Sequence, residues 1–114
     1  MSVGYTTTKY VALGFGEWLA FSYRGRGLKV SVACPGPVWG PMIKDIPYMH
    51  EDAITPDEAA DRVLEGLAAG KFLITTHPMT LSQIQQKAAD VDAYVDFLVG
   101  FREYALSLKA NGRG

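Results

Sequence analysis

The chain has 114 residues, of which 48% are hydrophobic and 20% are charged, and its formal net charge is −1. This length allows at most one domain, and the near-neutral charge gives no electrostatic reason to expect binding to nucleic acid or to an anionic membrane surface. A single cysteine, Cys34, excludes an internal disulfide, and no run of about 18 apolar residues could span a membrane. The amino terminus lacks the basic and apolar regions of a secretory signal, so we expect a cytoplasmic protein.

Residues 4–24 are predicted to form the first helix. Its apolar side chains recur at spacings of three and four residues and would share one packed face: Val11, Phe15, Trp18, Leu19 and Tyr23. Gly14 and Gly16 are poor helix formers, so we expect them where another element approaches the helix closely. The sequence Arg-Gly-Arg-Gly at residues 24–27 is typical of a helix end.

Residues 28–33 form a short run rich in β-branched side chains, which predicts a strand. The sequence Cys-Pro-Gly-Pro at residues 34–37 stops it. Residues 38–55 are rich in proline, methionine and aromatic residues without a sustained period, so we interpret them as a loop with one short helix near residues 42–46.

A second helix is predicted from Thr55, which can cap it, with Pro56 in the first helical position and Glu58 three residues after the cap. Four side chains would form its buried stripe: Ala60, Val63, Leu64 and Leu67. Gly70 should end this helix, and a second strand is predicted at residues 71–76.

Thr80 should open a last long helical segment, which Gly100 would interrupt before a frayed tail at residues 111–114. Its apolar residues step by three or four along one face: Leu81, Ile84, Ala88, Val91, Val95 and Leu98. The order strand, helix, strand predicts two parallel strands. Because parallel sheets are normally larger and covered on both faces, the chain is expected to be an incomplete fold.

Tyr5 and Lys9 stand four residues apart at the start of the first helix and therefore share a face. A nearby ammonium favours the charged phenolate and lowers the pKa of a phenol from its ordinary value near 10, which suits proton transfer. Spacing alone does not separate this reading from a surface tyrosine beside a solvated lysine.

The wider context resembles the short-chain dehydrogenase/reductase family. Tyr5-Thr6-Thr7-Thr8-Lys9 is similar to the active-site motif of that family, and Pro35-Gly36-Pro37-Val38 is similar to its Pro-Gly-x-Val segment. The segment from Thr55 to Pro78 resembles the family's last helix and last strand. The resemblance implies an α/β fold: residues 1–114 would be a single partial domain, the carboxy-terminal fragment of a Rossmann-like doubly wound parallel sheet, with the amino-terminal nucleotide-binding half absent.

The resemblance also implies an activity, hydride transfer between NAD or NADP and an alcohol or carbonyl substrate. Tyr5 would be the general acid or base, and Lys9 would assist it and bind the nicotinamide ribose. Pro35, Gly36 and Val38 would lie along the nicotinamide, with the backbone of Val38 near its carboxamide. A mobile substrate lid would follow, and its apolar side chains hint at a hydrophobic substrate: Trp39, Met42, Ile43, Ile46, Tyr48 and Met49.

Two departures from the family pattern stand out. Gly40 occupies a position where the family often has a threonine, and no glycine-rich phosphate loop, structural asparagine or catalytic serine precedes Tyr5. We therefore expect the isolated chain to be inactive. The alternative is a non-catalytic fragment that packs with a partner, such as a second copy, through the helix at residues 4–24, which in this family lies in a four-helix subunit interface.

Other candidate sites are weaker. The sequence Gly-Phe-Gly at residues 14–16 lies inside a helical pattern, not after a strand, so it is not a dinucleotide-binding loop. His50 and His77 have no suitably spaced cysteine or carboxylate, so no metal site is expected. Cys34 ends a strand and is interpreted as an apolar thiol.

Overall fold

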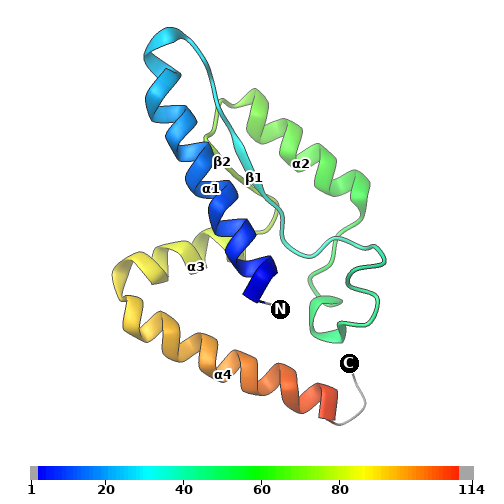
Figure 1. Ribbon diagram of the computed structural model, residues 1–114. Coiled ribbons are helices and arrows are strands. Elements are labelled where there is room, and N and C mark those ends of the chain that lie inside the picture. The colour runs from blue at the N-terminus through cyan, green and yellow to red at the C-terminus, as the bar shows by residue number, and fades with distance from the viewer. Residues whose placement is uncertain (1–2, 111–114) are drawn as a thin grey trace.

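The computed structural model describes residues 3–110 of the chain (Figure 1). Four α-helices and two β-strands follow one another along it, with two short 3₁₀ helices between them. In chain order the elements are α1 (Val3–Tyr23), η1 (Arg24–Arg26), β1 (Val32–Cys34), η2 (Pro47–Met49), α2 (Pro56–Ala68), β2 (Leu73–Thr75), α3 (Pro78–Ala89) and α4 (Val91–Ala110). The predicted order of helices and strands is confirmed, except that the last segment is two helices.

The two strands pair in parallel, with Val32 opposite Leu73 and Cys34 opposite Thr75. A parallel pair joined through α2 is consistent with a fragment of a Rossmann-like α/β fold. Each strand is three residues long, so the strands predicted at residues 28–33 and 71–76 are too long. Pro35 ends the pairing on one side because it has no N–H to donate.

Two glycines let the helices approach the strands. A Cβ atom at Gly16 of α1 would collide with the Val32 side chain, and one at Gly66 of α2 would lie 2.6 Å from Ile74. Val32 and Ile74 occupy alternating register positions, so their side chains point to opposite faces of the sheet. Figure 1 accordingly shows the strands between α1 and α2.

The packed face of α1 differs from the predicted one. The most buried residues of α1 are Gly16 and Ala20, whereas Val11, Phe15 and Trp18 are exposed. Since α1 is apolar on nearly every side, periodicity could not select a face, and the small residues that allow close approach decide it. A Cβ atom at Gly14 would meet no atom within 4 Å, so the expectation of close approach is confirmed for Gly16 and wrong for Gly14 in this chain.

Both ends of α2 are as predicted, but its packed stripe is not. The Thr55 hydroxyl accepts a hydrogen bond from the backbone N–H of Glu58 at 3.2 Å, and Gly70 follows the helix with a φ of 72°. Of the predicted stripe, only Val63 is half-buried; Leu64 and Leu67 are exposed. The helix instead turns Gly66 toward Ile74, because a close crossing needs a residue without a side chain.

The carboxy-terminal segment breaks at Asp90, not at Gly100. Asp90 has extended backbone angles, φ −158° and ψ 101°, and its carboxylate accepts a hydrogen bond from the backbone N–H of Ala93 at 3.0 Å. It thereby caps α4, as aspartate does at many helix starts. Gly100 lies inside α4, and the predicted tail at residues 111–114 lies outside the described residues.

The apolar stripe predicted along this segment is exposed throughout: Leu81, Ile84, Ala88, Val91, Val95 and Leu98. Helices α3 and α4 pack on each other, and the Cα radius of gyration of 16.1 Å exceeds the ~13 Å of a compact domain of about 100 residues. The described chain is therefore open, with apolar helix faces turned to solvent. Among residues 3–110, no helix combines the length and the apolar character that crossing a membrane requires.

Candidate active site

Tyr5 and Lys9 lie in the first turns of α1, on the side that faces the end of β1. The ammonium nitrogen of Lys9 is 5.2 Å from the centre of the Tyr5 ring, within the range of a cation–π contact. Both side chains border a pocket of about 250 Å³ whose opposite wall is formed by the end of β1 and Pro35. The fold thus brings the tyrosine–lysine pair and Pro35, about thirty residues apart in sequence, to one pocket, whereas Gly36 and Val38 do not line it.

Lys9 also borders a neighbouring pocket of about 490 Å³ that Cys34 lines. Burial raises the pKa of the Cys34 thiol above its ordinary value, and the positive charge of Lys9 partly opposes this shift. At neutral pH the thiol is therefore mostly protonated, which agrees with the interpretation of Cys34 as an apolar residue.

Gly36 holds the bend against β2 and the residues that follow it. Its backbone N–H donates to the hydroxyl of Thr76 at 2.8 Å, and a Cβ atom at Gly36 would lie 2.7 Å from Cγ of His77. Any side chain there would displace the imidazole, so glycine is required by packing. The bend therefore depends on contacts with residues forty positions away in the chain.

Val38 forms an isolated parallel bridge with Ile54. In this bridge Ile54 donates to the carbonyl of Pro37 at 3.1 Å and accepts from the N–H of Trp39 at 2.9 Å. The N–H and C=O of Val38 itself consequently point away from Ile54. No hydrogen bond of these two groups to another part of residues 3–110 is found.

Residues 39–53 form a loop that returns to the bend at this bridge. Its backbone is a series of turns in which Ile43 donates to Gly40, Ile46 to Ile43 and Met49 to Ile46. The short helix expected near residues 42–46 is wrong, because Pro47 cannot donate the hydrogen bond that would continue it. The only regular element of this loop is η2.

The six apolar residues predicted to form the lid are not equivalent. Ile43 is only 3% exposed, whereas Trp39 and Met42 are 43% and 66% exposed. The loop is held together by polar and ring contacts of His50, whose ring lies 4.9 Å from that of Trp39 and whose Nε2 is 2.7 Å from the carbonyl oxygen of Ile43. The remaining three, Ile46, Tyr48 and Met49, are half-buried.

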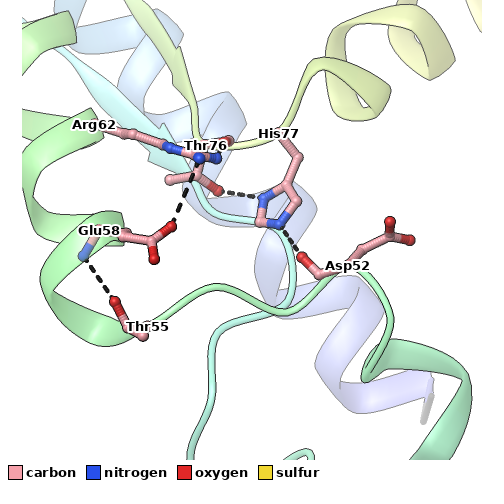
Figure 2. A network of polar contacts seen from close by, with 6 residues as sticks. All are labelled: Asp52, Thr55, Glu58, Arg62, Thr76 and His77. Atoms are coloured by element: carbon pink, nitrogen blue, oxygen red, sulfur yellow. Dashed lines mark hydrogen bonds and ion pairs between the residues drawn. The ribbon is translucent and has the colours of Figure 1, made fainter.

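Sequence reasoning assigned no role to Thr76 and His77, yet both are among the most buried polar side chains, at 4% and 6% exposure. Figure 2 shows His77 between the Thr76 hydroxyl, 2.8 Å from Nδ1, and the backbone oxygen of Asp52, 2.6 Å from Nε2. Arg62 of α2 donates to the carbonyl of Thr76 at 2.6 Å and lies 3.7 Å from the Glu58 carboxylate. The available signal was their position directly after β2, since sites in parallel sheets gather at the carboxyl ends of strands.

The position of Gly40 has room for a side chain, because a Cβ atom there would meet nothing within 4 Å. Packing therefore does not explain why this position lacks the threonine that the resemblance to short-chain dehydrogenases leads one to expect. Within residues 3–110, no group of three or more histidine, cysteine or acidic side chains is arranged to hold a metal ion.

A curated protein, the 1-deoxy-11-beta-hydroxypentalenate dehydrogenase of Streptomyces exfoliatus, is 26% identical to this chain over 98 residues. The aligned part covers 82% of this chain and 36% of that protein, so the chain spans about a third of the relative's length. No protein-family model matches the chain, and no solved structure matches it. The chain thus has a distant resemblance to one part of a dehydrogenase.

Proposed function

We propose that this chain is the catalytic and substrate-binding part of an NAD(P)-dependent oxidoreductase of the short-chain dehydrogenase type. The observation that carries the proposal is the shared pocket: Tyr5, Lys9 and Pro35 border one space, with the Lys9 ammonium 5.2 Å from the Tyr5 ring. A phenol, an ammonium and a wall of backbone in one pocket suit proton transfer to an oxygen that gains or loses hydride at its carbon.

In this proposal Tyr5 carries the proton. During oxidation its phenolate accepts the proton of the substrate hydroxyl as hydride leaves the carbon; during reduction the phenol returns that proton to the carbonyl oxygen. Lys9 lies beside it, with its ammonium nitrogen 5.2 Å from the centre of the Tyr5 ring, one helical turn further along α1. Tyr5 is 39% exposed, so a substrate can reach it from solvent.

The residues of the bend fit a nicotinamide. The N–H and C=O of Val38 offer one donor and one acceptor on the side away from Ile54, which matches the acceptor and donor of a carboxamide. Pro35 lines the same pocket as Lys9, and the Lys9 ammonium can donate to a ribose hydroxyl. The bound cofactor, NAD or NADP, supplies the hydride acceptor or donor.

The substrate is proposed to be an apolar alcohol or carbonyl compound. Trp39 and Met42 are the most exposed apolar side chains of the 39–53 loop and are the ones available to contact it. Ile43, Ile46, Tyr48 and Met49 would support the loop from within or line its less exposed part. The name of the curated relative likewise specifies a hydroxylated substrate.

Addition of NADH or NADPH to the purified 114-residue chain tests this proposal. A ligand that binds only the folded state stabilises it by about 2.7 kcal/mol at a hundredfold excess over its Kd, which raises the melting temperature. The shift should be smaller for Lys9→Met, whereas Lys44→Met, an exposed lysine of the loop, is the matched control. No shift with either nucleotide would contradict cofactor binding by this chain.

A second proposal is a non-catalytic packing module that associates through α1, with a second copy of the chain as partner. It is favoured by the exposed aromatic face of α1, where the rings of Phe15 and Trp18 stack at 6.5 Å and Trp18 lies 5.9 Å from Tyr23. Sedimentation of Phe15→Ser against the unchanged chain separates the proposals. Loss of association together with no response to nucleotide would support the packing module alone.

A further inference from the structure

The buried contact between His77, Thr76 and Asp52 joins three parts of the molecule. Thr76 and His77 follow β2, Gly36 belongs to the bend after β1, and Asp52 lies near the end of the 39–53 loop. Among the described residues, only Ala20, Ile43 and Ile74 form the comparably buried apolar core. A polar contact buried to this degree must be fully hydrogen-bonded to be tolerated, so its geometry is informative.

The Asp52 carbonyl can only accept and the Gly36 amide can only donate, which fixes the direction of two of these hydrogen bonds. Nε2 of His77 lies 2.6 Å from the backbone oxygen of Asp52, which can only accept, so Nε2 carries a proton. Thr76 accepts from the N–H of Gly36 at 2.8 Å, and its hydroxyl oxygen lies 2.8 Å from Nδ1 of His77, to which the hydroxyl can donate. With Nδ1 as the acceptor, the hydrogen bonds run in one direction from Gly36 through Thr76 and His77 to Asp52.

This series of hydrogen bonds connects the two ends of the 39–53 loop beside the Val38–Ile54 bridge. Gly36 and Asp52 are each two residues before a partner in that bridge, so two connections join the same pair of segments. Arg62 holds the carbonyl of Thr76 from α2, and Thr55 caps α2 immediately after Ile54 (Figure 2). The base of the loop is thereby attached to β2 and to α2 at once.

We propose that His77 is a positioning residue: through Thr76 and Asp52 it fixes the base of the 39–53 loop, and with it the backbone of Val38. The consequence for cofactor binding rests on the proposed function, because Val38 would hold the carboxamide. The consequence for the loop does not depend on that function.

Hydrogen exchange of the Trp39 and Ile54 amides in the purified chain tests the loop part. His77→Asn keeps a polar atom near the position of Nδ1 but loses the reach to Asp52, whereas His77→Gln keeps a donor near the position of Nε2. We expect exchange at both amides to rise roughly tenfold in His77→Asn and to stay near the unchanged level in His77→Gln. Equal exchange in the two variants would overturn the proposal.

Amides inside α2 report whether each variant remains folded. If the His77→Asn variant loses protection throughout the chain, a comparison of Thr76→Val with Thr76→Ser serves as the same test. Valine removes the hydroxyl that links Gly36 to His77, and serine keeps it. Faster exchange at Trp39 and Ile54 in Thr76→Val, rescued by serine, supports the proposal; unchanged exchange in Thr76→Val overturns it.

NADH titration, followed by the melting temperature, separates this proposal from the proposed function. If the chain binds NADH, His77→Asn should weaken binding by roughly tenfold relative to His77→Gln. Equal affinities would overturn the positioning of Val38 by His77. If the unchanged chain does not bind NADH while the exchange difference is observed, the proposed function fails and the fixing of the loop by His77 stands.

Discussion

Two regions of this short chain differ in how far their groups are satisfied by the rest of the chain. One is the carboxyl ends of the two strands, and the other is the outer faces of α1 and α4. At the strand ends, backbone and side-chain groups from residues 36 to 77 satisfy one another, and Thr76 and His77 are buried without a large apolar core around them. On the helices, Phe15, Trp18 and Val95 lie at least 48% exposed.

The two regions differ because hydrogen bonds are short-ranged and directional, so a few residues can satisfy the polar groups at the strand ends. Apolar burial requires a matching surface of considerable area, which residues 3–110 do not supply to these helix faces. We therefore expect substitutions at the strand ends to change chemistry and local stability. Substitutions on the outer helix faces should change association instead.

The largest expected effect concerns the proposed proton carrier. Tyr5→Phe removes the hydroxyl but keeps the ring against Lys9, so in an active protein that contains this chain we expect kcat to fall by about 10²–10⁴-fold. Steady-state kinetics measures the loss. Tyr10→Phe, which removes only a hydroxyl bonded to Lys87, is the control; wild-type turnover in Tyr5→Phe would remove Tyr5 from the mechanism.

Gly36→Ala tests the packing of the strand ends. The added methyl group would collide with the ring of His77, and overpacking of this kind costs about 1–3 kcal/mol in the free energy of unfolding. Gly40→Ala, a few residues along, meets open space and should change stability by less than about 0.5 kcal/mol. Urea denaturation of both variants checks the contrast, and equal stabilities would contradict the described contact.

A matched pair inside α1 compares its packed and open faces. Gly14→Ala meets no neighbouring atom and should stabilise the chain by about 0.5–1 kcal/mol, the ordinary gain of alanine over glycine in a helix. Gly16→Ala collides with Val32 and should destabilise it. Thermal denaturation gives the sign, and a gain for both variants would mean that α1 does not cross the sheet at Gly16.

The smallest effect concerns the thiol near Lys9. Alkylation requires the thiolate, and burial raises the pKa of Cys34, so its alkylation should be slow at neutral pH and accelerate as the pH rises. Lys9→Met removes the charge that opposes this shift, so it should raise the pKa further and move the rate profile to higher pH. Lys44→Met is the control; a profile unchanged by Lys9→Met would place the ammonium away from Cys34.

Local features of the fold were predictable because they depend on neighbours in sequence. The Thr55 cap, Pro56 in the first turn and the positive φ at Gly70 each follow from backbone geometry within one helical turn. The placement of Tyr5 and Lys9 on one face follows from the helical period alone. Their catalytic roles, and those of Pro35, Gly36 and Val38, stay predictions.

The sequence by itself determined the order of the main helices and strands, and it placed a phenol and an ammonium on the same helical face. Only the tertiary structure decided that Gly16, not Phe15 or Trp18, meets the sheet. It also decided that His77 reaches Asp52 and, through Thr76, Gly36. Spacing and propensity describe a few neighbouring residues, whereas shape complementarity and hydrogen bonds between residues 25 and 40 positions apart exist only after the chain has folded.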